Sequence, residues 1–186
     1  MIDKIFSISI YHDNVSDNMK HVIQYEIENT LLLYNDKLAY SWGDNIQTTF
    51  RYTKGFINHT PTLADFIKSS ISKYLSNLPV EYQSIDIIES WAAYSYPGGY
   101  QNYHTHLREP TISGVYYYQT SSNDGDIVFK SDSGGINHSI LNLQKVAIYK
   151  PEVGKIILFP SFLEHQVTRN CTDNTRISIA FNCVIK

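Results

Sequence analysis

The chain after residue 85 is dominated by short strand-like segments, and this run constrains the fold more than any other feature. Segments rich in Ile, Val, Tyr and Phe alternate with turn sequences such as PGG, SNDG and PEVG. β-Branched and aromatic residues favour strands, whereas clusters of Gly, Pro, Asn and Asp favour turns. We therefore predict a β barrel or sandwich whose strands lie at 85–96, 111–120, 126–131, 144–150, 155–160, 163–169 and 176–185.

Two amphipathic helices are predicted ahead of these strands. Residues 14–33 and 60–79 place apolar side chains at helical spacing, and Pro61 suits a first helical position. An opening strand is expected over 4–11, with short strands near 38–41 and 48–53. Because no linker or repeat is visible, we expect a single domain over 1–186, in which residues 1–80 support a β core over 85–186.

The net charge and the hydropathy of the chain argue against two classes of partner, nucleic acids and membranes. The formal net charge is −3, and Lys and Arg form no basic stripe, so we expect no nucleic-acid partner. No apolar run approaches the roughly 20 residues of a membrane span, and the first residues lack the pattern of a signal peptide. We therefore expect a cytoplasmic protein with no membrane partner, whose two cysteines are free thiols.

The last predicted strand, RISIAFNCVI, has two chemically different faces, because successive side chains alternate across a strand. The apolar face carries Ile177, Ile179, Phe181 and Cys183, and the other carries Arg176, Ser178, Ala180 and Asn182. We expect the apolar face to pack on the helices and the polar face to line an interior that binds a ligand.

Three histidines make up the candidate metal site. His104 and His106 follow a glycine-rich turn in QNYHTHLREP, and His165 follows in LFPSFLEHQV. Residues i and i+2 of an extended segment project to one side, so the first two rings can hold one divalent ion. Each histidine alone is weak evidence, but the ordered set of HxH, His and then Arg176-x-Ser178 is much more specific.

This ordered set resembles the 2-oxoglutarate/Fe(II)-dependent dioxygenases of the prolyl-hydroxylase-like kind found in bacteria and phages. The matching segments are ESWAAYSYPGGYQNYHTH, SGVYYY, GDIVF, EVGKIILFPSFLEHQV and RISIAFN. The resemblance implies a mainly β fold with N-terminal helices, a double-stranded β-helix (jelly roll, cupin-like). It also implies that His104 and His165 bind the metal and that Arg176 and Ser178 bind the distal carboxylate of 2-oxoglutarate.

The resemblance further implies the cofactors and the reaction. Fe(II) and 2-oxoglutarate would act with O2 to hydroxylate a small-molecule or peptide substrate, with release of succinate and CO2. The iron would carry the chemistry, so no side chain is assigned a separate catalytic role. Whether a second copy of the chain joins it in a homodimer is left open.

The chain departs from the family pattern at one position, because His106 stands where most such enzymes have Asp or Glu. We interpret His106 as the third ligand. The alternative is that Asp126 or Glu109 completes the site while His106, like Asn102, lies beside the ligands. Tyr116 and Tyr118 share one face of the predicted strand 111–120 and are assigned to the 2-oxoglutarate site.

Two other functions fit the same residues. Three neutral imidazoles also suit Zn, Cu or Ni, so a three-His cupin-like metalloenzyme that does not use 2-oxoglutarate is one alternative. A non-catalytic jelly-roll protein that binds a sugar or a peptide is the other, since a fold does not prove an activity.

Overall fold

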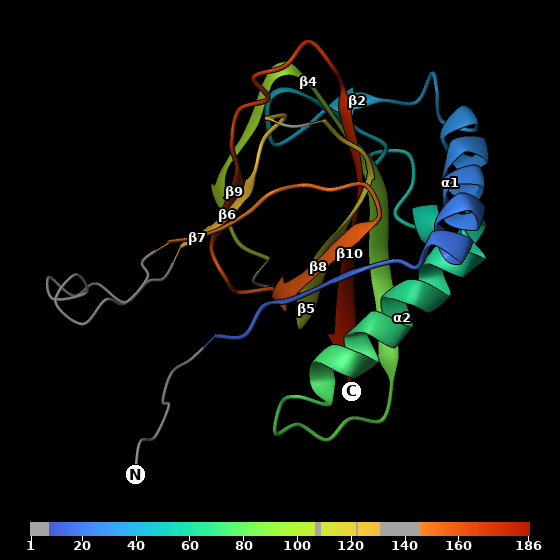
Figure 1. Cartoon of the computed structure of the whole chain (residues 1–186), viewed down its shortest axis with the longest axis vertical. Helices are drawn as coiled ribbons and strands as arrows, with labels where there is room; N and C mark the ends of the chain where they lie inside the picture. Colours follow the sequence, from blue (N-terminus) through green and yellow to red (C-terminus); the bar gives the residue numbers. More distant parts are fainter. Residues whose placement is uncertain (1–7, 107–108, 122, 131–145) are drawn as a thin grey trace, which may run out of the picture.

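The computed structural model describes residues 8–106, 109–121, 123–130 and 146–186. Two helices, α1 (Asp17–Leu32) and α2 (Pro61–Leu75), lie on one side of a curled antiparallel sheet, and a short 3-10 helix, η1 (Phe56–His59), precedes α2 (Figure 1). The strands are β1 (Tyr11–Asn14), β2 (Ala39–Tyr40), β3 (Gly43–Thr48), β4 (Ile85–His104), β5 (Ile112–Gln119), β6 (Ile127–Lys130), β7 (Val146–Tyr149), β8 (Lys155–Pro160), β9 (His165–Val167) and β10 (Arg176–Ile185).

The sheet curls because one long strand belongs to both of its halves. The strand order is β1-β8-β5-β10-β4-β9-β6-β7, with β3 paired to β4 and β2 paired to β3. The first part of β4 pairs with β10, and its last residues pair with β9. The sheet therefore turns back on itself as a half-barrel, which confirms the predicted mainly β fold of the jelly-roll type.

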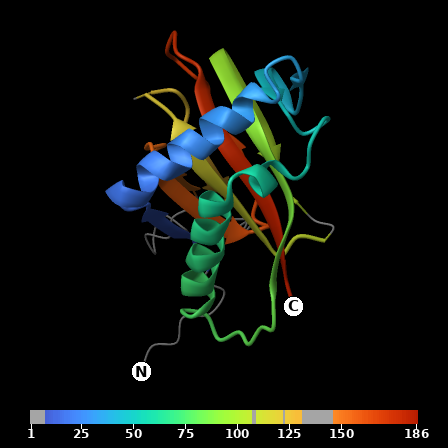
Figure 2. The ribbon, with the colours of Figure 1, turned by 90° about the vertical axis from the view of Figure 1, so that its right-hand side faces the viewer.

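The main hydrophobic core lies between the two helices and the outer face of the sheet (Figure 2). Ile177, Ile179 and Phe181 of β10 are buried in this core, which confirms the predicted division of that strand into two faces. Gly114 of β5 is required here, because a Cβ at this position would overlap the ring of Phe181. The other face of β10 is thereby turned toward the inside of the half-barrel.

The predicted helices and most predicted strands are confirmed, with three differences. β4 continues through the PGG turn sequence to His104, because Gly98 adopts a positive φ of 78° and the strand bends without ending. β3 covers 43–48, whereas a strand was expected at 48–53. The expected opening strand over 4–11 lies mostly outside the described residues, and β1 begins at Tyr11.

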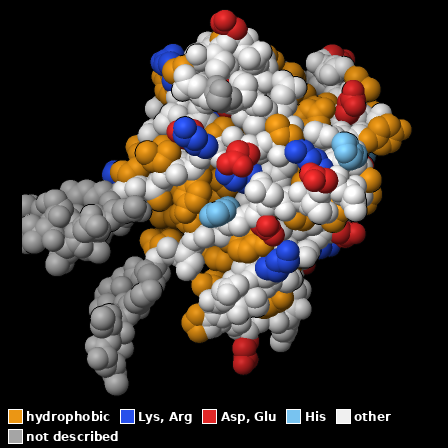
Figure 3. All heavy atoms as spheres, viewed as in Figure 1, with side chains coloured by type: hydrophobic (Ala, Val, Ile, Leu, Met, Phe, Trp, Pro, Cys, Tyr) orange, Lys and Arg blue, Asp and Glu red, His pale blue; other side chains and the backbone are white. Residues whose placement is uncertain are grey.

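The described surface is mixed in character. On the face shown in Figure 3, acidic and basic side chains are interspersed with apolar ones. Neither described helix combines the length and the apolar character that a membrane span requires.

Candidate metal centre and ligand cavity

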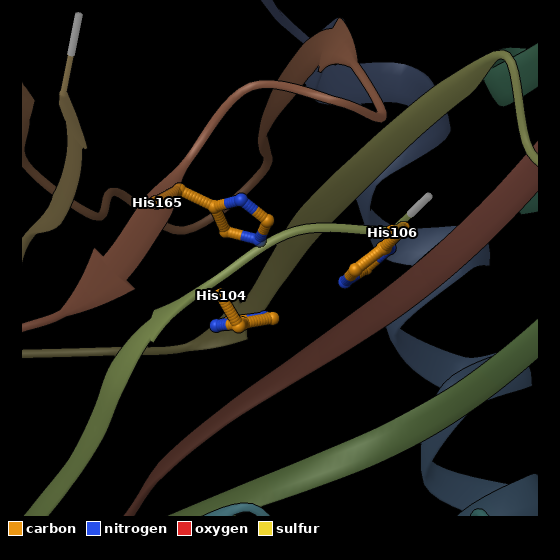
Figure 4. A group of neighbouring side chains, drawn as sticks. All are labelled: His104, His106 and His165. Atoms are coloured by element: carbon orange, nitrogen blue, oxygen red, sulfur yellow. The ribbon is translucent and has the colours of Figure 1, made fainter. Parts of the chain in front are cut away.

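Strand pairing brings the three histidines together. His104 is the last residue of β4 and lies directly across from His165, the first residue of β9. His106 follows two residues later, where its backbone N–H donates to the carbonyl of Ser161. The three rings turn toward a common space (Figure 4), and one ring nitrogen of each lies within 4.8 Å of the others. The geometry is that of a candidate site for a single metal ion.

Hydrogen bonds fix the orientation of all three imidazoles. Nδ1 of His104 donates to the carbonyl of Asn102 at 2.9 Å, and Nδ1 of His165 donates to the carbonyl of Leu163 at 2.8 Å. Nδ1 of His106 lies 2.8 Å from Oδ1 of Asn182. Since each Nδ1 faces an oxygen acceptor, each Nε2 keeps its lone pair, which is the arrangement of metal-binding histidines.

Burial keeps these rings neutral. It lowers the pKa of His104 and of His106 below the ordinary value. Burial, together with the neighbouring His104, lowers the pKa of His165 to about 3. Neutral imidazole is the form that binds a metal, so the site is prepared for an ion at neutral pH.

None of the carboxylates named as alternatives joins the three histidines. Asp126 lies outside the cavity lining, and its backbone N–H donates to the hydroxyl of Thr168. Glu109 is exposed. Asn102 contacts His104 through its backbone carbonyl. Among the described residues, the group that could hold a metal consists of three histidines alone.

The histidines line a cavity of about 900 Å³ inside the half-barrel. The polar face of β10 forms one wall, through Arg176, Ser178, Ala180 and Asn182. These are the four residues that the alternation of the last strand predicted for the interior. The cavity therefore joins the candidate metal site to the predicted carboxylate-binding residues.

Arg176 is buried in this cavity without an anionic partner. Its Nη1 donates to the backbone carbonyls of Asp124, at 3.2 Å, and of Gly125, at 2.7 Å. Its Nε is buried and has no hydrogen-bond partner, and Arg176 takes part in none of the ion pairs of the described residues. A buried charge is costly unless it is paired, so this guanidinium is placed to receive an anionic ligand.

The two faces of β5 are the reverse of the assignment made from sequence. Tyr116 is buried in the helix-side core, where it packs against Phe66, and Tyr118 packs at the margin of that core. Tyr117 lines the cavity instead, directly across from Ser178 of β10. Alternation alone separates the two sets of tyrosines, but the pairing register with β10 decides which set faces inward.

Three aromatic side chains that were not predicted from the sequence form a wall on the side of the cavity where β3 and β4 lie. Trp42, Phe50 and Trp91 contact one another edge to face or tilted, with ring centroids 4.7–5.6 Å apart. Trp42 has a positive φ of 57°, which is unusual for a bulky residue.

Ser95 of β4 is a further polar residue of the cavity that was not predicted. It lies across from Arg176, and its buried hydroxyl has no hydrogen-bond partner. No motif marks these positions, because the pairing of β3 and β10 with β4 brings them together.

One protein-family model matches the chain. Residues 89–182 match a family described as “Putative 2OG-Fe(II) oxygenase”, and this segment is just over half of the 186 residues. The match includes all three histidines, Arg176 and Asn182. No curated protein matches the chain.

Solved structures similar to the chain support the fold. A prolyl-4-hydroxylase from Pseudomonas putida superimposes with a TM-score of 0.67 at 12% identity, over 97% of this chain and 94% of that one. A prolyl hydroxylase from Trichoplax adhaerens, solved with a peptide fragment of hypoxia inducible factor, gives 0.66 at 13% identity, over 94% and 83%. HygX from Streptomyces hygroscopicus, solved with nickel and 2-oxoglutarate, gives 0.62 at 10% identity, over 95% and 83%. At these identities the likeness shows the fold alone.

Proposed function

Because the chain belongs to the family described as “Putative 2OG-Fe(II) oxygenase”, we propose that it is an Fe(II)- and 2-oxoglutarate-dependent dioxygenase. It would hydroxylate a small-molecule or peptide substrate and release succinate and CO2. The observation that carries this proposal is the presence, in one cavity, of three neutral imidazoles and a buried guanidinium without an anion.

The donor set fits Fe(II). Imidazole nitrogens suit iron as well as zinc, copper and nickel, and His104, His106 and His165 each present an Nε2 with a free lone pair. When bound, the iron would supply the activation of O2. The chain keeps the rings neutral and holds each of them in place through a hydrogen bond at Nδ1.

A second part of the cavity lining fits a dicarboxylate. Arg176 offers a planar fork of N–H donors that matches the geometry of a carboxylate, and two backbone carbonyls hold that fork in place. Ser178 and Tyr117 add hydroxyl groups beside it. We assign the distal carboxylate of 2-oxoglutarate to these three residues.

The aromatic wall is left for the substrate. Trp42, Phe50 and Trp91 line the cavity together, and flat apolar surfaces of this kind bind rings and aliphatic chains. Both proposed substrate classes occur among the similar structures. The Trichoplax enzyme was solved with a peptide, and HygX was also solved with hygromycin B.

Anaerobic titration tests this proposal. Fe(II) and 2-oxoglutarate added together should give the weak visible absorption of the iron–2-oxoglutarate chelate, whereas either one alone should not. A three-His metalloenzyme that does not use 2-oxoglutarate predicts Fe(II) binding without this band. Metal binding with no band at saturating 2-oxoglutarate would therefore contradict the proposal and favour that alternative.

A further inference from the structure

We propose that Asn182 and Glu89 are positioning residues for His106, and that Glu89 supplies from a distance the negative charge that a histidine lacks as the third ligand. This inference rests on the proposed metal-binding role of His106. It concerns side chains to which neither the sequence motifs nor the resemblance gives a role.

An uninterrupted chain of side-chain contacts runs from His106 to the exposed side chain of Lys54. Nδ1 of His106 lies 2.8 Å from Oδ1 of Asn182, and Nδ2 of Asn182 donates to Oε2 of Glu89 at 3.1 Å. The other carboxylate oxygen of Glu89 accepts from Nζ of Lys54 at 3.0 Å. The sequence separations are large, so the curled sheet is what assembles this chain.

The chemistry of Glu89 determines the direction of each hydrogen bond. A carboxylate only accepts hydrogen bonds, so Asn182 must present its NH₂ group to Glu89 and its carbonyl oxygen to His106. An amide oxygen also only accepts, so Nδ1 of His106 must carry the proton. Nε2 of His106 is then the atom left with a lone pair.

Ser113 and Ser161 stabilise the same orientation of the Asn182 amide. The hydroxyl of Ser113 donates to Oδ1 of Asn182 at 2.8 Å and lies 2.9 Å from the hydroxyl of Ser161. Ser113 and Asn182 are direct neighbours across β5 and β10. The amide of Asn182 is therefore held at both of its ends, and His106 has one preferred orientation.

Three histidines do not compensate the charge of a bound divalent ion. Two histidines and one carboxylate reduce the charge of a divalent ion by one, whereas three neutral imidazoles leave it at +2. Glu89 lines the same cavity and is linked to His106 through one intervening side chain, that of Asn182. Burial would raise the pKa of Glu89, but the hydrogen bonds from Lys54 and Asn182 outweigh it and the pKa is lowered. Glu89 is thus ionised at neutral pH.

Cobalt binding tests the inference without 2-oxoglutarate. The metal-free protein is titrated with Co(II), and its visible ligand-field bands report both affinity and geometry. Asn182→Leu removes the amide oxygen that lies 2.8 Å from Nδ1 of His106, together with the link to Glu89, at similar volume, and it leaves the hydroxyl of Ser113 3.0 Å from the same Nδ1. Glu89→Gln removes the charge but keeps an oxygen that can accept from Asn182. Thr48→Val is the matched control, because Thr48 lines the same cavity without contacting the histidines. His106→Ala shows what loss of the ligand itself does.

The expected results separate orientation from charge. Asn182→Leu should bind Co(II) about 10- to 100-fold more weakly, with shifted bands. Glu89→Gln should bind more weakly with band positions retained, and Thr48→Val should match the parent. Parental affinity and bands in both Asn182→Leu and Glu89→Gln would overturn the inference, and so would an equal loss in Thr48→Val. If His106→Ala binds as the parent does, the metal assignment itself falls.

Discussion

Replacing Arg176 with lysine separates charge from geometry at the proposed 2-oxoglutarate site. Lysine keeps the positive charge but has a single ammonium group in place of the planar fork. In the parent, the two carbonyls of Asp124 and Gly125 occupy Nη1, so the remaining N–H groups are free for a carboxylate. A lysine would have to divide its donors between these carbonyls and the ligand.

The expected loss of 2-oxoglutarate affinity can be calculated from the number of N–H donors that the substitution of Arg176 removes. A hydrogen bond to a charged group contributes about 1.5–3 kcal/mol, and about 1.4 kcal/mol corresponds to a tenfold change in affinity. Loss of one bond of the fork should therefore weaken 2-oxoglutarate binding by roughly 10- to 100-fold. Arg176→Ala removes the charge as well and should weaken binding further. Metal affinity in the absence of 2-oxoglutarate should be unchanged, because Arg176 is not a ligand.

Calorimetry of 2-oxoglutarate into the protein loaded with a redox-inert divalent ion measures this difference. Arg169→Lys is the matched control, because Arg169 also donates to a backbone carbonyl, that of Gly98 at 3.0 Å, but lies outside the cavity lining. If Arg176→Lys and Arg176→Ala bind 2-oxoglutarate as tightly as the parent, the reasoning about this guanidinium is refuted.

Three further predictions concern the histidines and the turn that holds Arg176. His104→Ala and His165→Ala should each abolish metal retention, measured as metal content after gel filtration. Their circular dichroism spectra should stay those of the parent. Stoichiometric metal in both variants would disprove the assigned site. The pKa of His165 is about 3 in the folded chain and ordinarily 6.5. As the pH falls, this histidine is therefore protonated in the unfolded chain before it is protonated in the folded chain. The contribution of this group to the free energy of unfolding of the metal-free protein should thus be highest above pH 6.5 and fall toward pH 3, by up to about 1.4 kcal/mol per pH unit. Urea titrations should show a shallower fall in His165→Leu. Gly125 has a φ of 104°, and a Cβ there would overlap the carbonyl of Thr168 and lie 3.0 Å from Nη1 of Arg176. Gly125→Ala should therefore lower the unfolding free energy by about 1–3 kcal/mol and weaken 2-oxoglutarate binding, and a parental melting temperature would argue against this strain.

The pattern of apolar and polar residues within single segments was enough to predict the two helices and β10. The two helices show apolar residues at helical spacing, and β10 alternates so regularly that its buried and cavity faces could both be named from sequence. The three histidines could be grouped because they occur in an ordered set with Arg176. The structure brings that set into one cavity.

Features that depend on register and curvature could not be predicted. Tyr116 and Tyr117 have the same local chemistry, and the pairing of Ser178 with Tyr117 is what turns Tyr117 inward. Glu89 and Asn182 are 93 residues apart, and no local pattern connects them. Their contact exists because β4 and β10 lie side by side in the sheet.

Succinate formation tests the central claim most directly. The purified chain is incubated with Fe(II), isotopically labelled 2-oxoglutarate and O2, and labelled succinate and O2 uptake are measured together. The parent protein should form labelled succinate in proportion to the O2 consumed, and His165→Ala should form none above background. A parent protein that binds both Fe(II) and 2-oxoglutarate yet forms no more succinate than His165→Ala would contradict this claim.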